Sequence, residues 1–215
     1  CTDPEFLRRA SLDAIGRLPT LDETKSFLED KSADKRNQLI ERLLADPAYA
    51  DHWANKWADL LRPNPDRVGL KSVYVLDQWL REAFRKNKPM DQFTREIITA
   101  NGSTHRFGPT VIYRDKRTPT ELAVIFNQIF LGMRLECAQC HNHPNEKWTQ
   151  TDFFSMAAYF AQVKRKGRGV SPPISGGTEW FFHGGSGEVK HPVTGEVLPP
   201  KPPGTAPVKL EEGAD

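Results

Sequence analysis

The sequence predicts a mainly α protein of eight or nine helices, followed by a C-terminal arm rich in Pro and Gly that contains one small β-hairpin. Three observations lead to this prediction. Helix-capping patterns recur through residues 1–163, and apolar side chains recur between them at helical spacing. Residues 164–215, in contrast, hold 10 of the 15 Gly and 8 of the 17 Pro. We therefore expect a helical domain at 1–163 and an arm at 164–215 that packs on it.

Two patterns mark the predicted helix starts: an acid directly before Pro, or a Thr three residues before an acid. The first pattern occurs at Asp3-Pro4 and Asp46-Pro47, and the second at Thr20 with Glu23, at Thr118 with Glu121 and, in a weaker form, at Thr149 with Asp152. Ser32, which has neither pattern, is a further candidate cap. The strongest apolar stripe begins at Leu122 and predicts a long helix that ends near Met133.

The predicted hairpin lies at residues 187–198, where apolar and polar residues alternate around the turn Pro192-Val193-Thr194-Gly195. Residues 199–207 are too rich in Pro for a helix or a central strand, so we expect an extended segment there.

Composition narrows the possible function classes. The chain has 215 residues, enough to bury a core without disulfide support. It carries 30 Lys and Arg against 28 Asp and Glu, and a net charge of +2 is too small to indicate nucleic-acid binding. No run of about 18 apolar residues is present, so we expect no membrane span.

The chemical motif of the chain is Cys137-Ala138-Gln139-Cys140-His141, which has the Cys-x-x-Cys-His pattern of c-type haem attachment. Two Cys three residues apart project from the same side of one helical turn, so both sulfurs can form thioethers with one haem. The His that follows then reaches the iron from the proximal side. The motif therefore predicts one covalent haem c, held by Cys137 and Cys140, with His141 as an iron ligand.

The motif has three other interpretations. A redox Cys-x-x-Cys normally opens a helix after a strand, whereas this one follows a long apolar helix. A zinc site needs four ligands, and the chain has no second Cys-x-x-Cys. A disulfide between Cys137 and Cys140 is the third alternative.

The sequence does not assign the second axial ligand of the iron. His191 is our first candidate, because Pro192 holds its backbone extended and a hairpin folded over the haem would present it. His52 is the reserve, and Met90, Met133 and Met156 are possible thioether ligands. An open iron position is the remaining alternative.

Two further features lie near the predicted haem site in the sequence. Trp148 follows the motif closely and is a candidate to stack on the porphyrin, with core packing as the alternative. Lys164, Arg165, Lys166 and Arg168 form a short basic run. It is typical of a solvated helix end, and pairing with haem propionates or an acidic partner is the alternative.

Several segments resemble a known family. They are residues 6–20 (FLRRASLDAIGRLPT), 47–61 (PAYADHWANKWADLL), 131–144 with the haem motif, 147–150 (KWTQ) and 191–195 (HPVTG). With these segments the chain resembles PSCyt2, the planctomycete cytochrome-type domain also labelled DUF1549. The resemblance implies a large exported multidomain protein, with further domains beyond this one, and a cytochrome character without a defined substrate.

Together these observations predict a c-type cytochrome domain that transfers single electrons to another domain of the parent protein or to a redox partner. Covalent haem attachment takes place outside the cytoplasmic membrane, so we expect a periplasmic or exported protein. No Ser-His-Asp or paired-carboxylate pattern indicates an enzyme in its own right. The alternatives are a haem with an open position, for ligand sensing or for peroxide or oxygen activation, and a haem that only stabilises the fold.

Overall fold

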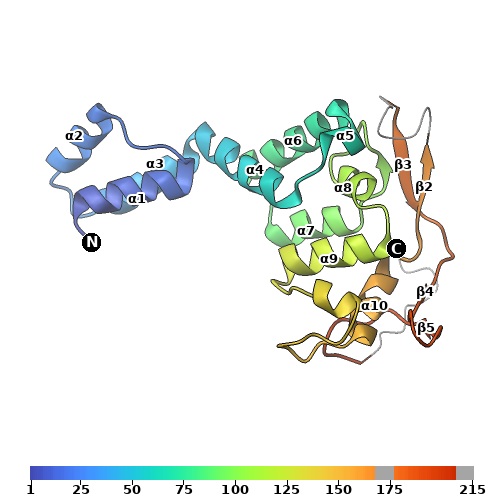
Figure 1. Cartoon of the computed structure of the whole chain (residues 1–215). Helices are drawn as coiled ribbons and strands as arrows, with labels where there is room; N and C mark the ends of the chain where they lie inside the picture. The colour runs from blue at the N-terminus through green and yellow to red at the C-terminus, as the bar shows by residue number, and fades with distance from the viewer. Residues whose placement is uncertain (168–176, 207–215) are drawn as a thin grey trace. The chain divides into compact units, whose positions relative to one another are not determined.

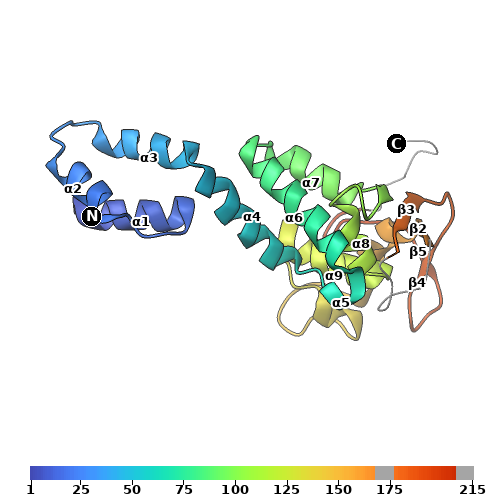
Figure 2. The same cartoon turned by 90° about the horizontal axis from the view of Figure 1, so that it is seen from above.

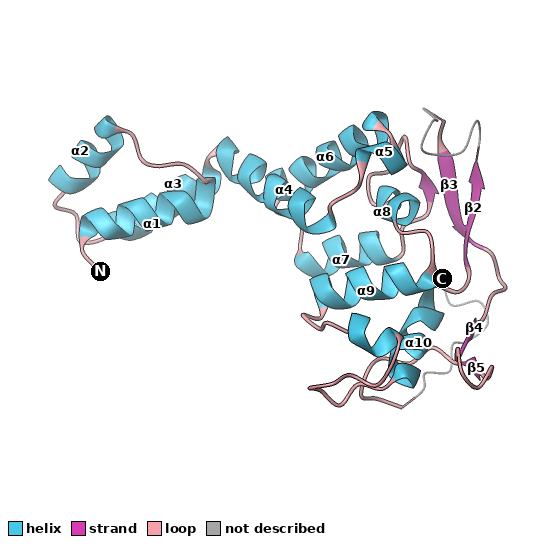
Figure 3. Ribbon diagram, in the orientation of Figure 1, coloured by secondary structure: helices cyan, strands magenta, loops and turns pink. Residues whose placement is uncertain are grey.

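The structure is a computed structural model that describes residues 1–167 and 177–206 (Figures 1 and 3). Its α-helices are α1 (Asp3–Ile15), α2 (Leu21–Glu29), α3 (Lys35–Ala45), α4 (Pro47–Leu61), α5 (Pro65–Val68), α6 (Leu70–Arg85), α7 (Met90–Ile98), α8 (Thr110–Asp115), α9 (Pro119–Phe130) and α10 (Gln150–Ala157). Two 3-10 helices are η1 (Glu136–Gln139) and η2 (Ala158–Phe160). The strands are β1 (Gly102–Ser103), β2 (Val163–Gly167), β3 (Glu179–His183), β4 (Val189–Lys190) and β5 (Val197–Leu198). The prediction of a mainly α fold is confirmed.

The chain forms two compact units. The first contains Cys1–Arg62 and Leu76–Phe93, and the second contains Pro63–Val75 and the described residues from Thr94 onward. Helices α6 and α7 therefore contribute residues to both units. The predicted arm at 164–215 is described only at 164–167 and 177–206; its remaining residues, 168–176 and 207–215, lie outside the described part of the chain.

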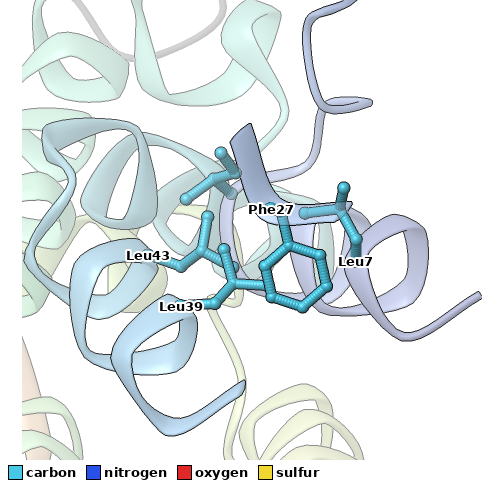
Figure 4. Close-up of a cluster of buried hydrophobic side chains, with 5 residues drawn as sticks. Leu7, Phe27, Leu39 and Leu43 are labelled. Atoms are coloured by element: carbon cyan, nitrogen blue, oxygen red, sulfur yellow. The ribbon is translucent and has the colours of Figure 1, made fainter. Parts of the chain in front are cut away.

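The first unit has a small core between its first three helices, which lie side by side (Figure 2). Leu7, Phe27, Leu39 and Leu43 converge from α1, α2 and α3, as Figure 4 shows. At the edge of this core the Asp3 carboxylate forms ion pairs with the neighbouring cations of α3, 2.6 Å from Lys35 Nζ and 2.7 Å from Arg36 Nη2.

A group of aromatic rings forms the other apolar centre of the first unit. Phe93 lies at its middle, with its ring centroid 4.6 Å from that of Trp57 and 4.9 Å from that of Trp79. Phe84 adds a further ring, 5.9 Å from Phe93. Aromatic pairs at these separations add to the stability that burial alone provides.

The core of the second unit forms around Phe126 on α9. Its ring centroid lies 5.1 Å from that of Phe160 and 6.0 Å from that of Tyr113. Tyr113 in turn lies 6.0 Å from Phe181 of β3. These contacts join helices α8 and α9 to a three-stranded antiparallel sheet in the order β1-β3-β2, where Gly102 faces Phe181 and Arg165 faces the same residue from the other side.

Most predicted helix starts are confirmed. Thr20, Thr118 and Thr149 each form a complete capping box, and Asp46 accepts a hydrogen bond from the Ala48 amide. The predicted caps at Asp3 and Ser32 are wrong. Thr2 caps α1 and forms a capping box with Glu5. Asp34 occupies the N-cap position of α3, and the Ser32 hydroxyl accepts a hydrogen bond from the Asp34 amide, before the helix begins.

The long apolar helix ends three residues earlier than predicted. Gly132 adopts a left-handed φ of 65°, and the amides of Leu131 and Met133 both donate to the Asn127 carbonyl. Gly accepts this conformation without the strain of a side chain, so α9 ends at Phe130 and the chain turns toward the Cys-x-x-Cys-His motif.

The predicted hairpin is confirmed: β4 and β5 pair with Val189 opposite Leu198 and Lys190 opposite Val197. The sequence predicts a helix end for the basic run that begins at Lys164, and for its described residues this prediction is wrong. Lys164, Arg165 and Lys166 lie in strand β2, because they pair along β3. Arg168 lies outside the described residues.

None of the helices in residues 1–167 and 177–206 has the length and apolar character that crossing a membrane requires.

The core of the first unit gives a direct stability prediction. Leu39 is 3% exposed, whereas its neighbour Ile40 on the same helix is 39% exposed. Leu39→Ala removes buried methyl groups and leaves a cavity, so it should lower the free energy of unfolding by about 2–5 kcal/mol. Ile40→Ala is the matched control and should change it by only about 0.5 kcal/mol. Denaturant titration followed by circular dichroism measures both values, and equal losses would contradict the proposed core.

Candidate functional site

The Cys-x-x-Cys-His motif begins in the 3-10 helix η1, which packs on α10 (Figure 1). In a 3-10 helix, residues three apart lie one above the other. Leu135 and Ala138 form one such pair and are buried against Phe153 of α10. Cys137 and Cys140 form the other pair, and both are free and exposed. The turn is therefore held by its apolar side while both thiols face solvent.

A glutamine at the start of α10 connects the two ends of the motif. The side-chain amide of Gln150 donates to the Gln139 carbonyl at 2.9 Å, and its backbone amide donates to the side-chain oxygen of Asn142 at 3.2 Å. The Trp148 carbonyl also accepts from the His143 amide at 2.8 Å. These bonds close the loop that carries His141.

His141 is exposed, and its Nδ1 lies 2.6 Å from the Asn142 carbonyl oxygen. A carbonyl oxygen can only accept, so Nδ1 carries the proton and donates. In the neutral ring this leaves the lone pair on Nε2. A metal-binding imidazole commonly has this arrangement, with one nitrogen donating to a backbone carbonyl and the other free for the metal.

His191 has the opposite arrangement. It lies in the turn of the β4–β5 hairpin, and its Nδ1 accepts from the backbone amides of Val193 and Thr194, each at 3.3 Å. In the neutral ring the proton is then on Nε2. The ring is half-buried and its centroid lies 6.4 Å from that of Phe154 on α10.

The hairpin and the motif turn therefore pack on the same helix, α10. Two segments that are far apart in the sequence, each carrying a predicted iron ligand, are therefore in contact with one helix. His52, the reserve candidate, belongs to the first unit, whereas the motif belongs to the second. Burial lowers the pKa of His52, and the nearby charge of Lys56 lowers it further.

Trp148 is half-buried and is held from several sides. Its indole N–H donates to the Glu146 carboxylate at 2.6 Å, and its ring packs on the Leu135–Ala138–Phe153 cluster. The Lys147 ammonium lies 5.0 Å from the ring centroid. Gly204 of the arm approaches so closely that an added Cβ would lie 3.4 Å from Trp148 Cζ3. Trp148 thus joins the motif loop to the arm.

The arm is also attached to α10 by its Lys201. The Lys201 amide donates to the Ser155 carbonyl at 3.2 Å, and its ammonium lies 3.0 Å from the Asp152 carboxylate. Asp152 also accepts from Thr149 in the capping box. Burial by itself raises the pKa of Asp152, but the hydrogen bonds from Thr149 and Lys201 outweigh it and hold the pKa below its usual value.

Sequence reasoning identified the motif and the hairpin but missed Gln150 and Asn142. Neither carries a chemical motif, and their roles depend on the fold of the loop between η1 and α10. Within residues 1–167 and 177–206, no group of three or more His, Cys, Asp or Glu side chains is arranged to hold a bare metal ion.

Comparison with known proteins identifies a family. The model of the PSCyt2 family, described as a protein of unknown function (DUF1549), matches residues 1–165. No curated protein and no solved structure matches the chain.

The lowered pKa of Asp152 predicts a pH-dependent attachment of the arm. Asp152→Asn should lower the free energy of unfolding by about 1–2 kcal/mol at neutral pH, because the charged partner of Lys201 is lost. The charge stabilises the fold fully above the pKa of an unfolded Asp, about 3.9, and this contribution disappears as the pH falls through the lower folded pKa. The difference between wild type and variant should therefore shrink below about pH 4.

Denaturant titrations at several pH values measure this difference. Asp59→Asn is the control, because Asp59 is exposed and has no ion pair in the described part of the chain. It should change the free energy of unfolding by only about 0.5 kcal/mol. A difference for Asp152→Asn that grows as the pH falls would contradict the assignment.

Proposed function

This chain belongs to the PSCyt2 family (DUF1549), and we propose that it is a c-type cytochrome domain. Cys137 and Cys140 hold one haem c covalently, and His141 is the proximal ligand of its iron. The observation that carries the proposal is the state of His141, whose Nδ1–H donates a hydrogen bond to the Asn142 carbonyl and whose Nε2 is left with its lone pair.

The chemistry of the thiols also fits the haem. Cys137 and Cys140 are both free and exposed. Each can therefore be alkylated by a large planar group without unpacking the core. Leu135 and Ala138 hold the turn from its buried side, so the thiols keep their spacing while they react.

The roles of the other residues follow from their contacts. Gln150 positions the carbonyl of Gln139 and the side chain of Asn142, and thereby the backbone around His141. Asn142 fixes the tautomer of His141 through its backbone carbonyl, and a hydrogen bond to an iron ligand is one way in which a protein would set the reduction potential of a bound haem. Trp148, beside the motif, is proposed to contact the porphyrin.

When bound, the haem supplies reversible one-electron chemistry, and the protein sets its potential through ligation, hydrogen bonds and burial. The proposed function is electron transfer to another domain of the parent protein or to a redox partner. The compartment proposed is the periplasm or the exterior, where covalent haem attachment takes place.

Covalent attachment tests this function directly. The full chain is produced in the periplasm of a host that matures c-type cytochromes, and is then extracted with acid–acetone and weighed by intact mass spectrometry. We expect the colour to stay with the protein and the mass to rise by one haem. Cys137→Ala and Cys140→Ala should each retain less haem, because one thioether is lost.

Cys1→Ala is the matched control, since Cys1 is also free and exposed but stands outside the motif. Its haem content should equal that of the wild type. Full extraction of the colour from the wild type, or equal loss in all three variants, would make the c-type assignment wrong.

A second candidate function, a haem with an open iron position, is favoured by the state of His191. Our proposed second ligand is His191, but its Nδ1 accepts two backbone amides, so the lone pair needed for iron is on the wrong nitrogen. Binding iron through Nε2 requires a proton shift to Nδ1 and the loss of both contacts. If these contacts persist, the position stays open for a small ligand.

Carbon monoxide distinguishes the two candidates. If His191 binds the iron, the reduced wild type should be low-spin and bind carbon monoxide poorly, and His191→Ala should become high-spin and bind it readily. His183→Ala, at an exposed position of β3, should behave as the wild type. If the reduced wild type binds carbon monoxide readily and His191→Ala changes nothing, the position is open and ligand sensing or oxygen chemistry replaces electron transfer.

A further inference from the structure

The second unit contains a cavity of about 270 Å³ that the proposed function does not use. Its lining residues come from helices α8 and α9 and the segment between them, from the 3-10 helix η2, and from strands β2 and β3. None of Cys137, Cys140, His141, Trp148 and His191 is among them. Ligand pockets span about 300–1,000 Å³, so this volume lies just below that range and suits a small ligand of one or two rings.

The deep part of the cavity is apolar and largely aromatic. Tyr113, Leu122, Phe160 and Phe181 are all buried residues that line it. The Tyr113 hydroxyl donates to the Ile98 carbonyl, so this residue presents its ring rather than its polar end. An aromatic ring of a ligand fits such walls through edge-to-face and offset contacts.

The outer part of the cavity is positively charged. Lys116, Arg117, Lys164 and Arg165 line it, and no Asp or Glu does. Two of these cations are paired with buried carboxylates that do not line the cavity: Lys116 with Asp115 at 2.5 Å and Arg117 with Glu179 at 3.0 Å. Lys164 and Arg165 form no ion pair within the part of the chain that the structure describes. The cavity therefore has an excess of positive charge.

The register of the sheet decides which of these cations faces the cavity. Arg165 lies directly opposite Phe181, so both side chains are on the same face of the sheet. Lys166 lies opposite Trp180, so its side chain belongs to the other face. Lys164 lies opposite Phe182 and starts from that other face too, although it is among the residues that border the cavity. The stem of Lys164 lies over Gly184, where an added Cβ would come within 2.2 Å of Lys164 Cγ. Arg165 is thus the cation placed to close on a ligand.

We propose that this cavity binds a small aryl carboxylate, with its one or two fused rings against Tyr113, Phe160 and Phe181 and its carboxylate on Arg165. A guanidinium matches a carboxylate through two parallel hydrogen bonds, and Arg165 has no carboxylate partner in the described residues that would compete. The site is separate from the residues proposed to hold the haem, so binding does not depend on the haem.

The test uses the full chain and three probes, measured by isothermal titration calorimetry: 2-naphthoate, its neutral analogue 2-naphthamide, and acetate. We expect 2-naphthoate to bind with a dissociation constant of about 1 mM or tighter. The amide lacks the charge and acetate lacks the ring, so each should bind about tenfold more weakly or worse.

Variants on one strand then locate the site. Arg165→Gln should weaken 2-naphthoate binding about tenfold, and Arg165→Lys should weaken it less, because it keeps the charge but loses the two-bond geometry. Lys166→Gln is the matched control: it removes the same charge from the next residue, on the other face of β2, and should leave affinity within about twofold. Thermal unfolding checks that all three variants fold.

Three outcomes would overturn the proposal. The wild type fails to bind 2-naphthoate, 2-naphthamide binds as tightly as 2-naphthoate, or Lys166→Gln weakens binding as much as Arg165→Gln does. The last result would indicate attraction by the general charge of the strand rather than a site at Arg165.

Discussion

The burial of Phe153 against Leu135 and Ala138 is the contact on which the candidate site depends. It seats the 3-10 turn on α10 by one side only, so the same turn must present Cys137 and Cys140 on the other. Apolar burial of this kind is non-directional, and it cannot by itself orient a side chain. Orientation comes from Gln150, whose two hydrogen bonds hold the backbone on both sides of His141.

Helix α10 also brings together parts of the second unit that the sequence separates widely. The motif turn, the β4–β5 hairpin and the segment around Lys201 all pack on it. Trp148, just before the helix, contacts the motif loop and Gly204 of the arm. Asp152, in the first turn of the helix, contacts the capping residue Thr149 and Lys201 of the arm. The arm is thus part of the folded unit, although its Pro and Gly content is typical of a linker. Its apolar residues, such as Phe181, Val189 and Leu198, account for this, because they are buried.

The two histidines in the segments that pack on this helix, His141 and His191, show why a ligand cannot be assigned from position alone. His141 and His191 are both half-buried or exposed and both lie in turns, yet their Nδ1 atoms have opposite roles. A carbonyl next to Nδ1 frees Nε2 for a metal, whereas amides next to Nδ1 do the reverse. Arg165 and Lys166 of β2 likewise differ although they are adjacent, because neighbouring residues of a strand face opposite sides of the sheet.

The features that depend on neighbouring residues could be predicted from the sequence. The capping boxes at Thr20, Thr118 and Thr149, the hairpin around Pro192 and the Cys-x-x-Cys-His motif each occupy only a few positions of the chain. The structure has these three helix starts and the hairpin where they were predicted. The remaining features depend on contacts between distant segments. Strand β3 pairs with β1 and β2, so the basic run became a strand instead of a helix end, and the cavity beside Arg165 arose from that pairing. The roles of Gln150 and Asn142 likewise follow from a loop closed by hydrogen bonds. Capping and periodicity act over one or two turns and leave a local pattern, whereas pairing between distant segments depends on which surfaces the folded chain brings together.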